Sequence, residues 1–146
     1  MSKLTLVIAF IMSSALATPV IASPSTQFFP AENGKPFSAA VRIGNSVYTS
    51  GVLGVAPDGT LPSDFTVQAT NAMQAVADHL KLAGASMSDV YRCNVSLSDM
   101  KNVPSFNAVY VKYFKPDRLP VRMAVGVIGL AQGAAVEVEC EAYIQQ

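Results

Sequence analysis

Few side chains of this 146-residue chain can carry acid–base, nucleophilic or metal chemistry near neutral pH. The chain has one histidine, His79, two cysteines and no tryptophan, and its 10 Lys and Arg residues balance 10 Asp and Glu residues. One histidine and two cysteines cannot supply the three or four nitrogen and sulfur ligands of an ordinary zinc site. A mechanism of the Ser-His-Asp or Cys-His type would have to use His79. Because only 14% of the residues are charged and the charges balance, the chain also lacks the basic surface expected of a nucleic-acid-binding protein.

Arg122 is the charged residue that is hardest to explain as ordinary surface. It lies inside the mostly apolar run 119–127, and the planar guanidinium of an arginine matches the two oxygens of a carboxylate. An acidic row at Glu137, Glu139 and Glu141 follows on the last predicted strand. If the last two strands form a hairpin, this row can provide an internal partner. Periodicity therefore leaves two interpretations, a structural Arg–Glu pair and a binding site for a ligand carboxylate.

The elements that position these residues follow from hydrophobic periodicity. The spacing predicts a helix that begins after Ser63 or Asp64 and reaches about Ala83, with a buried stripe that includes Val67. A second helix opens at Pro104 and ends before residue 116. Residues 23–35 are predicted to be an extended lead-in without a strand. Strands are predicted at Ser38–Ile43, 47–51, 90–98, 121–127 and 135–143.

The order β-β-α-β-α-β-β predicts an α+β domain with a mixed sheet and both helices packed on one face. Along the last three strands, one alternating set of residues is apolar and is expected to face the helices. The other set is expected to face away from the helices and consists of Arg92, Asn94, Arg122, Glu137, Glu139 and Glu141. Cys93 and Cys140 belong to the apolar set, where free buried thiols are the default, although an oxidising compartment would allow a disulfide between them.

The first residues have the composition of a secretory signal peptide. Lys3 precedes a short apolar segment, and small residues occupy the −3 and −1 positions of two cleavage sites, after Ala17 and after Ala22. The apolar segment is interrupted before it reaches the roughly 20 residues that span a bilayer. We therefore expect export, with residues 1–22 removed and a single domain at 23–146 in the periplasm or outside the cell.

Several segments of the chain resemble the RidA (YjgF) family in order and spacing, and the resemblance covers residues 36–143. It rests on Phe37-Ser-Ala-Ala-Val-Arg-Ile-Gly-Asn45, Val47-Tyr-Thr-Ser-Gly51, Ser96-Leu-Ser-Asp-Met100, Phe106-Asn-Ala-Val-Tyr110, Pro120-Val-Arg122 and Ala135-Val-Glu-Val-Glu139. The resemblance implies a chorismate-mutase-like fold and a homotrimer with clefts between its subunits. It also implies hydrolysis of reactive 2-imino or enamine acids to 2-keto acids and ammonia, without a cofactor or a metal.

The resemblance also assigns roles to individual residues. Arg122 matches the arginine that binds the substrate carboxylate, and Glu137 matches the acid that holds the attacking water. The further substrate-binding positions are matched by Ser50, Gly51, Asn107 and Phe37. Because an imine carbon is already electrophilic, a positioned water and help with proton transfer suffice for such a reaction.

Three departures from the family pattern leave a second function open. Phe37 stands where the family usually has tyrosine, Val52 where glutamine is frequent, and Ala124 where many members have cysteine. The pocket is therefore expected to be more apolar and to hold fewer hydrogen-bond donors, so the usual small imino acids need not be its best substrates. The alternative function is a non-catalytic trimer that binds a carboxylate ligand in the same cleft. A ribonuclease, a label sometimes attached to this family, is disfavoured by the balanced charge and the single histidine.

Overall fold

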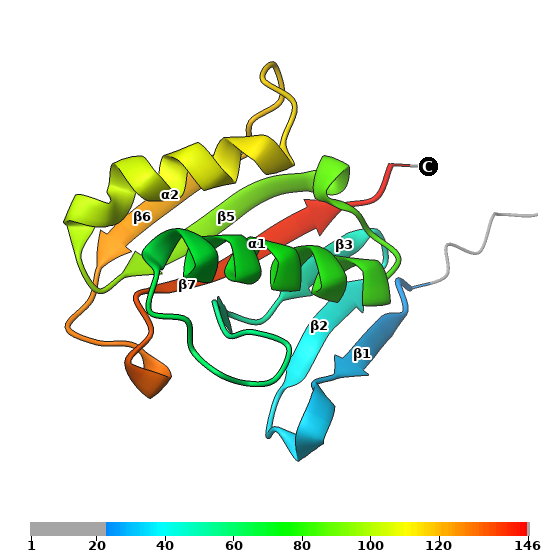
Figure 1. Ribbon diagram of the computed structural model, residues 1–146. Coiled ribbons are helices and arrows are strands. Elements are labelled where there is room, and N and C mark those ends of the chain that lie inside the picture. Colours follow the sequence, from blue (N-terminus) through cyan, green and yellow to red (C-terminus); the bar gives the residue numbers. More distant parts are fainter. Residues whose placement is uncertain (1–22, 146) are drawn as a thin grey trace, which may run out of the picture.

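The computed structural model describes residues 23–145 and contains one mixed β-sheet with two α-helices on one of its faces (Figure 1). The helices are α1 (Phe65–Leu82) and α2 (Val103–Tyr110). The strands are β1 (Thr26–Pro30), β2 (Ser38–Ile43), β3 (Ser46–Thr49), β4 (Val52–Leu53), β5 (Val90–Leu97), β6 (Val121–Gly126) and β7 (Val136–Tyr143). The predicted signal peptide lies outside the described residues. No helix within residues 23–145 is long and apolar enough to cross a membrane.

The sheet has the strand order β1-β2-β3-β7-β5-β6, and the short β4 also pairs with β7. β5 and β6 are parallel and are connected through α2, whereas every other strand pair described is antiparallel. β5 therefore lies between β6 and β7, and the expected hairpin of the last two strands is wrong. The physical reason is that β5, α2 and β6 form a parallel crossover unit, and β7 then returns beside β5.

Helix α1 begins and ends where its local sequence predicts. The Asp64 carboxylate accepts a hydrogen bond from the backbone N–H of Val67 at 2.9 Å, and Gly84 follows the helix with a φ of +79°, a conformation that favours glycine. The expectation that Val67 is buried is wrong, because Val67 lies one residue away from the stripe that faces the sheet. Gln68 is buried in its place, and its amide bonds the carbonyl of Pro62 and the N–H of Ala135.

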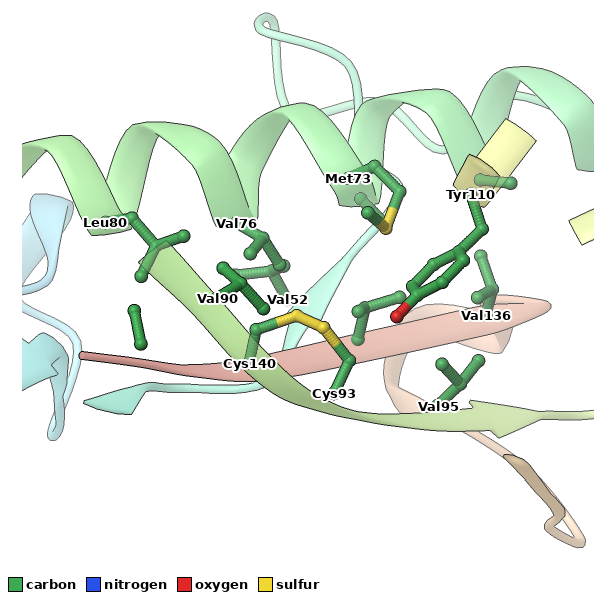
Figure 2. Packing of buried hydrophobic residues seen from close by; sticks show 14 of the residues in the cluster. Val52, Met73, Val76, Leu80, Val90, Cys93, Val95, Tyr110, Val136 and Cys140 are labelled. Atoms are coloured by element: carbon green, nitrogen blue, oxygen red, sulfur yellow. A yellow bond between two sulfur atoms is a disulfide. The ribbon is translucent and has the colours of Figure 1, made fainter. Parts of the chain in front are cut away.

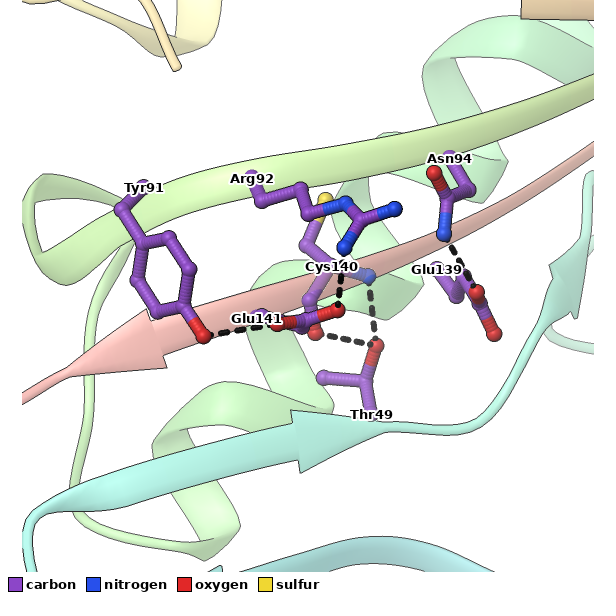
Figure 3. Close-up of polar contacts among 7 residues, drawn as sticks. All are labelled: Thr49, Tyr91, Arg92, Asn94, Glu139, Cys140 and Glu141. Atoms are coloured by element: carbon purple, nitrogen blue, oxygen red, sulfur yellow. Dashed lines mark hydrogen bonds and ion pairs between the residues drawn. The ribbon is translucent and has the colours of Figure 1, made fainter. Parts of the chain in front are cut away.

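The hydrophobic core lies between the two helices and the sheet, and a disulfide bond runs through it (Figure 2). Cys93 and Cys140 are register partners on β5 and β7, their Cα atoms are 4.1 Å apart, and their sulfur atoms are bonded. The default expectation of free thiols is therefore wrong. Thr49 Oγ1 accepts a hydrogen bond from the N–H of Cys140 at 3.0 Å and donates one to the carbonyl oxygen of Cys140 at 3.2 Å (Figure 3).

Two strand predictions differ from the structure, one of them at the β1 edge of the sheet. Residues 26–30 form β1, which pairs with β2, whereas an extended lead-in without a strand was expected. β1 is exposed along most of its length, so its sequence shows none of the apolar alternation that identifies a half-buried strand. The predicted strand 47–51 corresponds to β3, which ends two residues earlier, and the short β4 that follows at Val52–Leu53 was not predicted.

Candidate functional site

Arg122 lies on β6 and points towards α2, on the side of the sheet that the helices cover. Its register partner on β5 is Cys93, whose side chain is in the core. The guanidinium carbon of Arg122 lies 4.8 Å from the ring centroid of Tyr110 and 5.7 Å from that of Phe106, and both rings belong to α2. The expectation that Arg122 shares a face with Arg92 and the acidic row is therefore wrong.

The apolar residues of β6 face away from the helices. Val121, Met123 and Val125 are 68%, 51% and 37% exposed, and their register partners on β5 are the polar residues of the helix-free face. The alternation suggested the opposite orientation because an apolar row is normally buried in the core of its own chain. An exposed apolar row of this kind is typical of a surface that contacts another protein subunit.

Arg122, Phe106, Asn107 and Tyr110 form what we call the Arg122 cluster, at the edge of the sheet beside α2. Within residues 23–145, Arg122 forms no ion pair. The Oδ1 atom of Asn107 and the hydroxyl of Tyr110 are buried, and neither has a hydrogen-bond partner in the described part of the chain. Burial raises the pKa of the Tyr110 hydroxyl, and the positive charge of Arg122 partly opposes that rise. The cluster thus presents a guanidinium group without an internal carboxylate.

Glu137 belongs to a second group on the opposite side of the sheet. On β7 it is the register partner of Leu53 and Ser96, and it projects away from the helices because its neighbours in the strand point into the core. A Cβ atom added to Gly51 would lie 2.6 Å from Oε1 of Glu137. A side chain at position 51 would therefore displace the Glu137 carboxylate, which occupies that space.

Ser50 completes this second group, which we call the Glu137 cluster: Glu137, Gly51 and Ser50. The Ser50 hydroxyl donates a hydrogen bond to the carbonyl oxygen of Ser38 at 2.6 Å. Phe37 directly precedes Ser38 in the chain and has an exposed ring. Within the described residues, Glu137 forms no ion pair, so its carboxylate is available to a ligand or a water molecule.

The rest of the acidic row is held by residues of β5 (Figure 3). Glu141 accepts a hydrogen bond from the Tyr91 hydroxyl at 2.6 Å and lies 3.7 Å from a guanidinium nitrogen of Arg92. The hydrogen bond to Glu141 raises the pKa of Tyr91 to about 12. Glu139 accepts a hydrogen bond from the Asn94 amide at 2.8 Å. These two glutamates therefore have structural partners, and Arg122 is not one of them.

The predicted site residues are thus divided between two places. Arg122 and Asn107 belong to the Arg122 cluster on the helix side of the edge strand. Glu137, Ser50 and Gly51 belong to the Glu137 cluster on the helix-free side, and β5 separates the strands that carry Arg122 and Glu137. One chain therefore does not bring the arginine and the acid to the same ligand.

The sequence did not reveal the aromatic contact to Arg122. Tyr110 is buried, and its ring also lies beside the guanidinium of Arg122. The available signal was the spacing of Phe106 and Tyr110, which places both rings on one face of α2.

Within residues 23–145, no group of three His, Cys, Asp or Glu side chains is placed to hold a metal ion.

Comparisons with known proteins agree with this architecture. The family model described as Endoribonuclease L-PSP matches residues 30–144. The 2-iminobutanoate/2-iminopropanoate deaminase of Mus musculus is 34% identical over 117 residues, which cover 79% of this chain and 85% of that protein. The crystal structure of RidA from an Antarctic Psychrobacter bacterium is 36% identical, with a TM-score of 0.72 over 84% of this chain and 99% of that one.

A further solved structure, E. coli TdcF with bound serine, is 29% identical, with a TM-score of 0.72 over 85% of this chain and 99% of that one. The expected fold, a mixed sheet with two helices on one face, is confirmed by these structures. Relatives at about 35% identity are named as deaminases of imino acids. The chain belongs to the RidA (YjgF) family.

Proposed function

We propose that this protein hydrolyses 2-imino or enamine acids to 2-keto acids and ammonia, at a site formed between two subunits of a homotrimer. The observation that carries the proposal is Arg122, a guanidinium held against aromatic rings with no carboxylate partner within residues 23–145. A group of this kind suits a ligand carboxylate because it can donate two parallel hydrogen bonds. The names of the deaminase relatives supply the reaction class.

The proposed chemistry needs one positioned ligand and one positioned water. Arg122 binds the carboxylate and fixes the adjacent C=N carbon. Glu137 accepts a proton from water as the oxygen adds to that carbon, and the imine nitrogen takes up a proton. The resulting carbinolamine breaks its C–N bond, so that ammonia leaves and the keto acid remains. Water thus supplies the oxygen of the product, and no electron donor or acceptor is consumed.

The division of the site between two sides of the sheet supports an assembly of several subunits. The Arg122 cluster of one subunit and the Glu137 cluster of the next would together hold the carboxylate and the water. The exposed apolar row of Val121, Met123 and Val125 lies on the strand that carries Arg122, where it would be covered by a neighbouring subunit. In a closed ring of three, every subunit would contribute one half to each of two sites.

The direct test measures keto-acid formation from an imino acid that an amino acid oxidase generates in the assay. We expect the protein to accelerate keto-acid release, and Arg122→Ala to lower kcat/KM by about 100-fold, because charge-assisted bidentate binding is lost. Arg118→Ala is the matched control, since Arg118 is an exposed arginine outside both clusters. No acceleration across a panel of small and bulky imino acids would contradict the proposal, as would full activity of Arg122→Ala.

A mixing experiment tests whether the two clusters meet between subunits. Arg122→Ala and Glu137→Gln are each expected to be inactive as pure trimers. If equal amounts are unfolded and refolded together, about one interface in four pairs an intact Arg122 with an intact Glu137 in a cyclic trimer. We therefore expect recovery of about a quarter of the wild-type activity. Without any recovery, the two residues would have to act within one chain.

A second candidate function is binding of a carboxylate ligand without catalysis. It is favoured by the loss of polar groups at Phe37 and Ala124 and by the serine bound in the related E. coli TdcF. The expectation that Val52 makes the cleft more apolar is wrong, because Val52 is packed in the hydrophobic core. In that case 2-oxobutanoate or serine should raise the Tm of the wild type but not of Arg122→Ala, and the assay should show no turnover. Unchanged melting with every acid would count against this binding function.

We also propose that the protein acts in the periplasm or outside the cell. The support is the predicted signal peptide at residues 1–22 and the two cleavage sites after Ala17 and Ala22. Fractionation of cells that produce the full chain, followed by mass measurement of the product, tests this proposal. A chain that keeps Met1 and stays with the cytoplasmic fraction would contradict it.

A further inference from the structure

We propose that the Tyr110 ring, supported by Phe106, is a positioning platform that holds the Arg122 guanidinium in place for the ligand carboxylate while leaving all its N–H donors free. The inference rests on the proposed function, since it concerns how the same arginine is presented. It assigns to Tyr110 a role in ligand affinity, beyond its packing in the core. The role depends on the aromatic ring and not on the hydroxyl.

Arg122 is held differently from two other arginines of the sheet. Arg42 donates to the carbonyl oxygens of Gly44 and Ala83 at 2.8 and 3.3 Å, and Arg92 lies 3.7 Å from the Glu141 carboxylate. Both of these guanidinium groups use donors within the chain. Arg122 is held by ring faces, at 4.8 Å from the Tyr110 centroid and 5.7 Å from that of Phe106. These distances lie within the range in which an aromatic face attracts a cation.

An aromatic face leaves the N–H groups of Arg122 available to a ligand. A carboxylate partner would fix an arginine by taking two of its N–H groups, and a ligand carboxylate would have to displace it. A ring face attracts the cation through its quadrupole and does not take up the two N–H groups that a carboxylate would bind. The rings therefore restrict the orientation of Arg122 without competing with the ligand.

The two rings that form the platform are fixed by packing. Phe106 and Tyr110 are 1% and 3% exposed, and the centroid of the Tyr110 ring lies 5.7 Å from that of Phe106 and 4.7 Å from that of Phe114. Figure 2 shows the hydroxyl end of Tyr110 directed into the core near Val136. That hydroxyl has no hydrogen-bond partner among the described residues, so no hydrogen bond within residues 23–145 anchors the ring.

The test compares two substitutions at position 110 in the intact protein. Tyr110→Phe keeps the ring, and its KM for 2-iminobutanoate is expected to stay within about twofold of the wild type. Tyr110→Leu removes the ring, and KM is expected to rise about fivefold with kcat little changed, because roughly 1 kcal/mol of cation–ring attraction is lost. Tyr113→Leu is the matched control, since that ring is on the turn after α2 and its hydroxyl bonds Thr70.

A second readout needs no activity. The Nε–H proton of Arg122 should resonate upfield in the wild type and in Tyr110→Phe because of the aromatic ring current, and it should lose this shift in Tyr110→Leu. Arg122→Lys, which lacks the group, assigns the signal. If Tyr110→Leu does not fold, pentafluorophenylalanine at position 110 keeps a ring but reverses its quadrupole, and it should raise KM relative to Tyr110→Phe.

The outcomes separate the two proposals. The platform is overturned if the ring-less or fluorinated variant has the KM of Tyr110→Phe, or if the Arg122 resonance does not depend on the ring. If Arg122→Ala retains full deaminase activity, the proposed function fails, and the resonance still decides whether Tyr110 holds the guanidinium. A fivefold rise in KM for Tyr113→Leu would also contradict the platform, because the effect would then be a general consequence of losing an aromatic residue.

Discussion

Reduction of the Cys93–Cys140 disulfide is expected to lower the stability of the domain strongly. The two residues are 0% and 1% exposed and join β5 to β7. The sequence separation of 47 residues means that the closed loop contains α2 and β6, and therefore the whole Arg122 cluster. When the bond is reduced, the unfolded state gains the conformational freedom of that loop, while the folded state keeps both sulfur atoms in the core.

The magnitude follows from the length of the loop. In the chain-entropy description, a loop of about 47 residues corresponds to about 4 kcal/mol of stabilisation at 25 °C. For a domain of this size, such a loss corresponds to a fall in Tm of about 10–16 °C. Reduction is a cleaner perturbation than substitution, because the two thiols leave the packing volume of the core nearly unchanged.

The assay is equilibrium unfolding of the unmutated protein in guanidinium chloride, with and without a phosphine reductant. Both samples are measured at the same protein concentration, because the unfolding of an oligomer depends on concentration. The free energy of unfolding should be lower by about 2–4 kcal/mol in the reduced protein. Thiol titration of the denatured, unreduced protein should find neither cysteine free. Two titratable thiols, or equal free energies of unfolding in both conditions, would contradict a stabilising disulfide.

Gly51, Asp64 and His79 each have a contact or a degree of burial that a single measurement can test. Gly51→Ala should lower kcat by at least about tenfold, because the new Cβ would displace the Glu137 carboxylate. Gly129→Ala is the control and should leave kcat unchanged, because a Cβ at Gly129 would meet no atom within 4 Å. Asp64→Ala should cost about 1 kcal/mol in chemical denaturation, because the first turn of α1 loses its cap. The pKa of His79 should lie below 6.5 in an NMR titration, because burial, aided by Lys35, disfavours its charged form. Neutral His79 then contributes its full stabilisation of the folded state above pH 6.5, and this stabilisation is lost as the pH falls through the lower pKa that His79 has in the folded protein. A pKa at or above 6.5 would contradict this prediction.

The elements that pack against the core could be predicted from the sequence because their patterns report burial directly. The cap at Asp64 and the periodicity that follows it predicted α1 to within about two residues at each end, and the strand at Ser38–Ile43 was predicted with its observed bounds. β1 could not be predicted in this way, because an edge strand that is mostly exposed has no apolar face to reveal it. Its pairing with β2 is a consequence of tertiary structure.

The cysteines show a second limit of the sequence. Alternation placed Cys93 and Cys140 correctly on the core face of their strands. It could not decide between thiols and a disulfide, because that depends on the register of β5 against β7. A shift of one residue in this register would place both cysteines opposite residues of the other face and separate the sulfur atoms.

The error about Arg122 explains why its sequence context was unusual. Arg122 attracted notice as a charge among apolar neighbours, and the neighbours were assumed to be the buried set. In the structure Val121 and Met123 are exposed, and Arg122 is the residue that faces the helix layer. A charge on that side of an edge strand is tolerated only if it remains open to solvent and has a compatible surface beside it, and the rings of α2 provide that surface. The residues that hold Arg122 in place are therefore on α2, the helix before it in the chain. The apolar residues on either side of Arg122 belong to the exposed row on the helix-free face.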